Sequence, residues 1–220
     1  MKLKETDLWC CTRTDLSLLI KGRVLFYRHQ LETYIKLRPE FEESLVPVHK
    51  DSFAPEIVRN MIEASGLLGV GPMATVAGAI AEYVGRDIAG LTDEYIIENG
   101  GDIYLRTAHE RVVLIYAKDS PYSEKIGVKL KGRDTPYGVC TTSGTVGPSL
   151  SFGRADAVCI VGNSSLFADG LATYVGNIVK KKDDIAVAIE KGKAFPEVTG
   201  ILIVFGNHLG IWGDLEIVKV

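Results

Sequence analysis

A carboxylate and a hydroxyl lie four residues apart in the segment ADGLATYVG, at Asp169 and Thr173. If this segment is helical, that spacing places both side chains on one helix face. Paired oxygen donors of this kind suit a hard divalent cation such as Mg²⁺, which prefers oxygen ligands and keeps several waters. The alternative is an exposed Asp beside a Thr that bonds back to its own helix. By spacing alone, this alternative is the commoner arrangement.

A second candidate is the turn Gly100-Gly101-Asp102, in ENGGDIYL. As plain structure it is a tight hairpin, because Asn-Gly and Gly-Gly supply the positive φ that such turns need. As a binding element, a turn without side chains lets a ligand approach the backbone while Asp102 or Asn99 bonds it. The sequence leaves both interpretations open.

The stretch YGVCTTSGTVGPSLSFGRADA combines hydroxyls, glycines and one thiol. Thr142, Ser143 and Gly144 could form a nest of backbone N–H groups that binds an anion, or only a hydroxyl-capped turn. Cys140 stands just ahead of them. A free Cys usually behaves as a small buried hydrophobe, but polar backbone around Cys140 could give it thiolate character.

Composition excludes several classes of protein. The chain has 220 residues, 46% of them hydrophobic, and a net charge of −3. Its one basic run, at 180–182, is followed at once by two aspartates, so a nucleic-acid-binding face is not expected. No apolar run approaches the ~20 residues that span a bilayer, and the N-terminus has no signal core. We therefore expect a cytoplasmic protein that binds a small-molecule ligand and binds neither nucleic acid nor membranes. A homodimer is compatible with these features.

The cysteines and histidines form no recognisable metal or catalytic motif. The four Cys show no CxxC pair and no Cys/His spacing typical of a metal site, so a disulfide framework is not expected either. The four His have no Ser or Cys neighbour at a motif spacing, and nothing in the sequence indicates a hydrolase triad.

Periodicity predicts the elements that must position these residues. Apolar residues at helical spacing predict helices, and short β-rich runs predict strands. The helices are expected over residues 15–37, 55–68, 73–84, 164–179 and 183–192. The strands are expected over residues 3–12, 94–100, 102–108, 111–117, 156–162, 199–206 and 213–220.

The predicted helices and strands are grouped rather than strictly alternating. Grouping favours an α+β fold, with mostly antiparallel strands packed against helices, over a doubly wound parallel sheet. No linker is evident, so residues 1–220 are expected to form one domain, with related halves at about 1–108 and 109–220. We expect the three segments over 94–117 to pair with one another as antiparallel strands.

One motif is rejected on its context. The run Gly69-Val70-Gly71-Pro72-Met73-Ala74 fits the dinucleotide pattern G-x-G-x-x-A. That pattern needs a strand before it and a helix after it. Here a helix is predicted before it and Pro72 lies inside it, so we expect a glycine turn that leads into the next helix.

Six segments together resemble an uncharacterised prokaryotic family within the ApbE-like superfamily. They are ETDLW, LETYIKLRPEF, VGPMATVAGAIAE, ENGGDIYL, GVCTTSGTVGPS and FADGLATYVGN. The resemblance extends over nearly the whole chain and keeps the order of these segments. The best-known members of the superfamily are Mg²⁺-dependent FAD:protein FMN transferases. The resemblance implies a T-fold-like architecture of two related halves, with Mg²⁺ and FAD or FMN as cofactors.

The resemblance also assigns roles to particular residues. ADGLAT resembles the Asp-Ala-Leu-Ala-Thr of the transferases, whose Asp and Thr hold the metal, which implies Asp169 and Thr173 as metal ligands. GGDI and TSG match motifs of the flavin-nucleotide site. The residues implied to bind the cofactor are Gly100, Gly101, Asp102, Thr142, Ser143 and Gly144.

Two departures from the transferase pattern count against FMN transfer itself. Glu82 stands where the transferases carry a lysine, which would turn a positive charge near an anionic cofactor into a negative one. The interval between the TSG turn and the next helix has no His, where the transferases have His-Ile-Ile-Asp-Pro.

Three hypotheses follow. The first is an ApbE-like protein that binds a flavin- or nucleotide-type ligand with Mg²⁺. The second is a transferase-like role in sulfur assimilation toward homocysteine and cysteine in anaerobes, which the resemblance suggests, with Cys140 as the catalytic thiolate or persulfide carrier. The third is a scaffold without catalysis, which predicts tolerance of substitution at Asp169.

Overall fold

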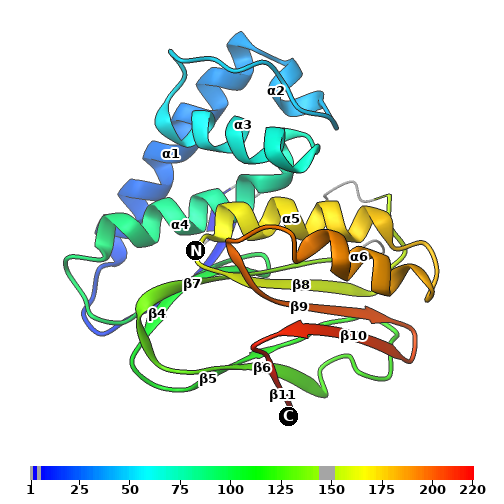
Figure 1. Ribbon diagram of the computed structural model, residues 1–220. Coiled ribbons are helices and arrows are strands. Elements are labelled where there is room, and N and C mark those ends of the chain that lie inside the picture. The colour runs from blue at the N-terminus through cyan, green and yellow to red at the C-terminus, as the bar shows by residue number, and fades with distance from the viewer. Residues whose placement is uncertain (1, 4–5, 144–151) are drawn as a thin grey trace.

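The computed structural model describes residues 2–3, 6–143 and 152–220, and it places helices on one side of a large antiparallel sheet (Figure 1). Along the chain from the N-terminus, the helical elements are α1 (Ser17–Leu37), α2 (Glu40–Glu43), α3 (Glu56–Leu68), the 3₁₀ turn η1 (Pro72–Thr75), α4 (Val76–Ile88), α5 (Ser165–Ile178) and α6 (Asp184–Gly192). The large sheet has the strand order β1-β2-β3-β4-β7-β8-β9-β10, with every neighbouring pair antiparallel. Its strands are β1 (Lys2–Leu3), β2 (Thr6–Thr12), β3 (Tyr95–Asn99), β4 (Asp102–Thr107), β7 (Arg133–Thr142), β8 (Ala157–Gly162), β9 (Val198–Phe205) and β10 (His208–Gly213).

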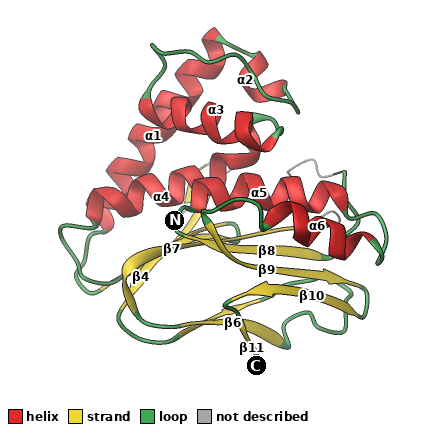
Figure 2. Ribbon diagram, viewed as in Figure 1, coloured by secondary structure: helices red, strands yellow, loops and turns green. Residues whose placement is uncertain are grey.

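A second, smaller sheet lies on the opposite side of the large one from the helices (Figure 2). Its order is β11-β6-β5, made of β11 (Glu216–Lys219), β6 (Ile126–Leu130) and β5 (Arg111–Leu114). The α+β fold of antiparallel sheets packed against helices is thereby confirmed.

The core has two parts because the large sheet is covered on both faces. Alternate residues of a strand point to opposite faces, and on β4 this sends Tyr104 toward the helices and Leu105 toward the smaller sheet. Every residue of β8, which lies inside the sheet, is buried. The residues of β4 and β7 that face α4 and α5 are therefore the ones available for a site beneath the helices.

Local signals in the sequence explain where the helices begin and end. The Asp15 carboxylate accepts a hydrogen bond from the Ser17 N–H at 3.0 Å, although Leu16 and not Asp15 holds the N-cap position of α1. Gly69 ends α3 in the left-handed region, at φ +69°, a conformation that glycine adopts without a steric penalty. The expected glycine turn between two helical elements is confirmed, and with it the rejection of the dinucleotide motif.

Several predicted elements differ from those observed. The segment at β5 was expected to join β3 and β4, but β5 pairs with β6, because β7 takes the place beside β4. The strands β6 and β10 and the short helix α2 were not expected. The stretch from Tyr137, expected as a bend, is strand as far as Thr142.

The halves of the chain share one continuous sheet, joined where β4 pairs with β7. A repeat relating residues 1–108 to 109–220 stays a prediction. Within the described residues, no single helix is long and apolar enough to cross a membrane.

Candidate functional site

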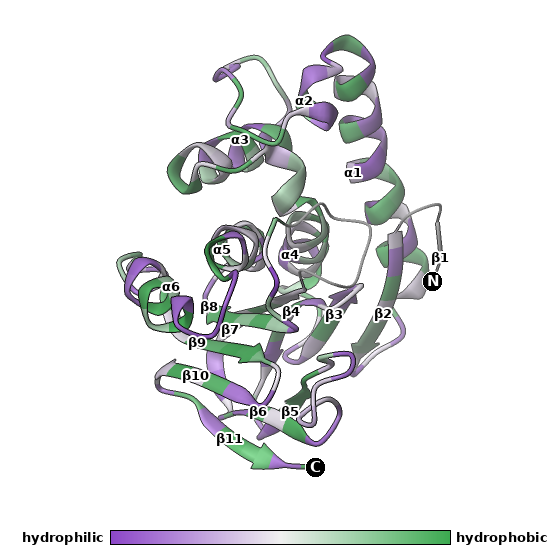
Figure 3. Cartoon of the chain, turned by 90° about the vertical axis from the view of Figure 1, so that its right-hand side faces the viewer, coloured by the Kyte–Doolittle hydropathy of each residue, from purple (hydrophilic) through white to green (hydrophobic). Residues whose placement is uncertain are grey.

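Asp169 lies on α5 and points at the first turn of α4. Its Oδ2 accepts a hydrogen bond from the Gly78 N–H at 3.0 Å, and the Ala77 N–H also bonds the carboxylate. The first amides of a helix have no partner within the helix and carry partial positive charge. Asp169 therefore caps α4 from a neighbouring helix. Figure 3 shows α4 and α5 end on, side by side above the sheet.

Asp102 follows the turn between β3 and β4. Gly100 and Gly101 have φ of +64° and +103°, so the expected hairpin turn is confirmed. Asp102 is buried, and its carboxylate accepts a hydrogen bond from the Thr141 N–H. Asp102 lies directly opposite Cys140 in the pairing of β4 with β7. The GGD turn and the CTTS segment, far apart in the sequence, are thus brought together.

The two carboxyl groups, buried on Asp102 and half-buried on Asp169, influence each other. Burial, and then the nearby charge of Asp169, raise the pKa of Asp102 well above its ordinary value. Burial raises the pKa of Asp169 to about 7, although the hydrogen bonds from Gly78 and Ala77 act against this rise. Among the described residues, neither carboxyl has a salt-bridge partner. A bound cation would supply the positive charge that this pair lacks.

Thr173 lies one helical turn after Asp169 and is 6% exposed. Asp169 and Thr173 are therefore four residues apart on one helix, as predicted, but this helix is mostly buried rather than exposed. The alternative of an exposed Asp on a solvated face is wrong, because Asp169 is turned to the start of α4. Roles for Asp169 and Thr173 as metal ligands stay predictions.

Thr142 and Ser143 lie at the end of β7 and are partly buried. Thr142 shares the helix-facing side of its strand with Cys140, two residues earlier. Gly144, the last residue of the expected cofactor-binding set, lies outside the described residues.

Cys140 is fully buried, and its Sγ lies 3.2 Å from the carbonyl oxygen of Ser165. Burial raises the pKa of its thiol well above the ordinary value, and the charges of Asp102 and Asp169 raise it further. The neutral thiol is therefore the stable form. This environment opposes a thiolate or persulfide role, which stays a prediction from the sequence.

Three features of the site were not foreseen. The amides of Ala77 and Gly78 hold Asp169, and the Asn99 side chain donates a hydrogen bond to the Ala77 carbonyl oxygen at 3.2 Å. Gly78 is required where α4 meets α5, because a Cβ there would lie 2.1 Å from the Ser165 carbonyl oxygen. The only hint in the sequence was the series of small residues in the α4 segment.

Glu82, which stands where the transferases carry a lysine, lies at the contact between α4 and α5. It is 2% exposed, and its Oε2 accepts hydrogen bonds from the Ser164 hydroxyl at 2.6 Å and the Leu166 N–H at 3.0 Å. It also forms an ion pair with Arg86. The carboxylate is directed at the start of α5, and the effect of its negative charge on an anionic cofactor stays a prediction.

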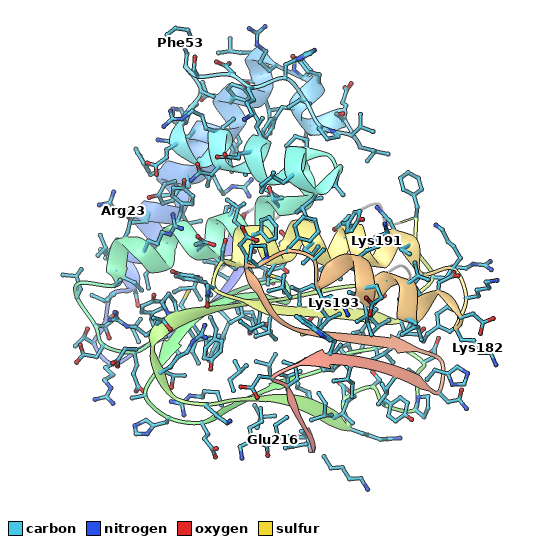
Figure 4. The ribbon with its side chains drawn as sticks, viewed as in Figure 1. Arg23, Phe53, Lys182, Lys191, Lys193 and Glu216 are labelled. Atoms are coloured by element: carbon cyan, nitrogen blue, oxygen red, sulfur yellow. The ribbon has the colours of Figure 1, made fainter. Side chains whose placement is uncertain are left out.

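Two surface hollows of about 590 and 640 Å³ lie elsewhere, around the end of α1 and residues 47–55. Phe53, at the top of Figure 4, projects from this part of the chain. None of the candidate site residues that the structure describes lines either hollow. In the described part of the chain, no cluster of three or more His, Cys, Asp or Glu side chains could hold a metal. Any cation at Asp169 and Thr173 would therefore depend on water or ligand oxygens as well.

The sequence matches the family described as AbpE bacteria over residues 1–197. The chain is similar to the UPF0280 protein MJ1526 of Methanocaldococcus jannaschii, with 42% identity over 202 residues that cover 89% of this chain and 82% of the relative. It is 40% identical to a UPF0280 protein of Methanosarcina acetivorans over 197 residues, which cover 89% of this chain and 78% of the relative.

Among solved structures, the flavinyl transferase ApbE of Pseudomonas stutzeri, in its apo form, shares the fold. The TM-score is 0.58 at 15% identity, with 96% of each chain covered.

Proposed function

The chain belongs to the AbpE bacteria family, an ApbE-like family, and we propose that it binds a flavin- or nucleotide-type ligand together with Mg²⁺ at the site formed by Asp102, Asp169 and Thr173. The observation that carries this proposal is the pair of interacting carboxyl groups, buried Asp102 and half-buried Asp169, which has no salt bridge within the described residues. A protein interior tolerates such a pair poorly unless protons or a cation neutralise it. The fold relative from Pseudomonas stutzeri is a flavinyl transferase, which supports a flavin as the ligand class.

Mg²⁺ suits the donors that the site offers. Asp169 and Thr173 would hold it through hard oxygen atoms, and Asp102 would add negative charge nearby. When bound, Mg²⁺ would neutralise phosphate charge and polarise a phosphoryl oxygen. The amides of Ala77 and Gly78 fix the Asp169 carboxylate in place.

The ligand would lie where the GGD turn meets the end of β7. The Gly100-Gly101 backbone presents no side chain that would block a ligand. Thr142 and Ser143 would supply hydroxyl groups, and the β4–β7 pairing places these residues near the turn. We limit the proposal to binding, because the sequence between β7 and α5 has no His to match the transferase motif.

Isothermal calorimetry with FAD, FMN and ATP, each with Mg²⁺ and with EDTA, tests the proposal. We expect the wild-type protein to bind at least one of these ligands more tightly with Mg²⁺. Asp169→Asn and Thr173→Ala should each weaken Mg²⁺-dependent binding by tenfold or more, as the loss of a charged or direct oxygen ligand implies. Asp134→Asn, at an exposed position of β7, is the matched control and should bind normally.

Absence of binding to all three ligands in the wild-type protein would contradict the proposal. So would equal affinity in wild type and Asp169→Asn, which is the outcome that a non-catalytic scaffold predicts.

A further inference from the structure

Glu82 is a buried carboxylate that lies outside the proposed site, on the helix that packs against it. Its Oε2 accepts hydrogen bonds from the Ser164 hydroxyl and the Leu166 N–H. Ser164 is the N-cap of α5, and Leu166 is the second residue of that helix. A carboxylate at this point is stabilised by the positive end of the helix. Glu82 therefore caps α5 from α4.

The capping is reciprocal. Asp169, on α5, bonds the first-turn amides of α4, while Glu82, on α4, bonds the first turn of α5. Between these contacts, the Ser165 hydroxyl donates a hydrogen bond to the Gly78 carbonyl oxygen at 2.8 Å. Each helix thus fixes the start of the other, and sliding of α5 along α4 would break both contacts together.

Arg86 extends this arrangement to the sheet. It forms an ion pair with Glu82, one turn earlier on α4, and its side chain bonds Tyr104. Tyr104 is on β4, two residues after Asp102 and on the same face of the strand. Glu82 is therefore connected to both elements that carry the carboxyl pair: α5 with Asp169, and β4 with Asp102.

We propose that Glu82 is a positioning residue for the Mg²⁺-ligand site, holding α5 in the register that sets Asp169 and Thr173 against Asp102. The proposal rests on the proposed function for its link to ligand binding. The positioning of Asp169 itself can be measured without any ligand.

The first measurement is amide hydrogen exchange by NMR in the protein without ligand. In Glu82→Gln, exchange at the Ala77 and Gly78 amides should rise about tenfold more than exchange at Ile201 and Leu202 in the core of β9, because the two α4 amides depend on Asp169 for their bonds. A uniform rise at all four amides would mean general destabilisation only and would overturn the proposal. Glu63→Gln, at an exposed position on α3, is the control and should change nothing.

Ser164→Ala provides a second variant if Glu82→Gln folds poorly. It removes one of the two hydrogen bonds that Glu82 accepts, together with the bond that the Ser164 hydroxyl accepts from the Phe167 N–H, and it leaves the Glu82 carboxylate in place. The same selective rise at Ala77 and Gly78, of a few-fold, is expected. No selective rise in either variant would overturn the proposal.

The second measurement is ligand affinity by calorimetry with the Mg²⁺-nucleotide that the wild-type protein binds. Glu82→Gln should lower this affinity about tenfold at unchanged stoichiometry, at a temperature where both proteins are fully folded. Equal affinity would overturn the role at the site. If the wild-type protein binds no nucleotide, the proposed function fails, and the exchange measurement alone decides whether Glu82 positions Asp169.

Discussion

The thiol groups of Cys140 and Cys11 lie in opposite surroundings. Cys140 is buried, and the pKa of its thiol is raised well above the ordinary value by burial and then by the nearby carboxyls, whereas Cys11 is exposed on β2. Only the thiolate is a competent nucleophile. We therefore expect iodoacetamide at pH 8 to label Cys11 in the native protein and to leave Cys140 and Cys159 unlabelled, as read by peptide mass spectrometry.

Unfolding in guanidinium supplies the control for this labelling experiment, because all four thiols should then react. Labelling of native Cys140 as fast as Cys11 would contradict its burial. That outcome would also strengthen the hypothesis of a sulfur carrier.

Single residues of the site could be predicted from sequence only where the signal is local. The four-residue spacing of Asp169 and Thr173 and the glycine turn before Asp102 depend on neighbours in the chain, and both indicated the observed geometry. The partners of Glu82 could not be found in this way, because Ser164 lies 82 residues further along. The structural role of Glu82 depends on the helix that packs against it, and no periodicity in the sequence predicts that contact.

At the scale of elements, the contact between α4 and α5 depends on the absence of a side chain at Gly78. A Cβ at that position would lie 2.1 Å from the Ser165 carbonyl oxygen, so the helices would have to separate. We expect Gly78→Ala to lower the free energy of unfolding by about 2–4 kcal/mol, as overpacking at a rigid contact does. Urea unfolding followed by circular dichroism measures this change.

Gly66→Ala is the matched control for Gly78→Ala. Gly66 is also inside a helix, α3, but an added Cβ there meets nothing within 4 Å. Alanine has the higher helix propensity, so this variant should gain about 0.5–1 kcal/mol. Equal effects of the two substitutions would show that the α4–α5 contact is not closely packed.

Element type was easier to predict than element pairing. The helix α3 follows a strong apolar period and α5 is apolar along most of its length, and the bounds of both agree with the sequence to within about two residues. The alternation of half-buried and exposed residues on β5, in contrast, does not specify which strand pairs with it. Its partner is β6, which was missed because Gly127 and Lys129 interrupt its apolar character. Long-range packing, not local preference, decides such pairings.

At the scale of the whole molecule, two groups of carboxyls give stability opposite dependences on pH. Glu94 accepts a hydrogen bond from the Ala108 N–H at 2.8 Å, and this bond is the main reason that its pKa is lowered to about 2. A lowered pKa adds stability that is present above the ordinary value of 4.5 and is lost as pH falls toward 2. Asp102 and Asp169 act in the other direction, because their pKa values are raised.

Without metal, the protein should therefore be most stable at mildly acidic pH. The folded state keeps the Asp169 proton up to a pKa of about 7, against 3.8 when unfolded, so the free energy of unfolding falls as pH rises from about 4 to 7. We expect Asp102 and Asp169 together to lower the free energy of unfolding by on the order of a few kcal/mol over this pH range. In Asp169→Asn, the free energy of unfolding should decrease less between about pH 4 and pH 7. At pH 8 in EDTA, this variant should be more stable than the wild-type protein. Chemical denaturation at pH 5 and pH 8 measures both proteins, and parallel profiles for the two would show that Asp169 is not the group that titrates.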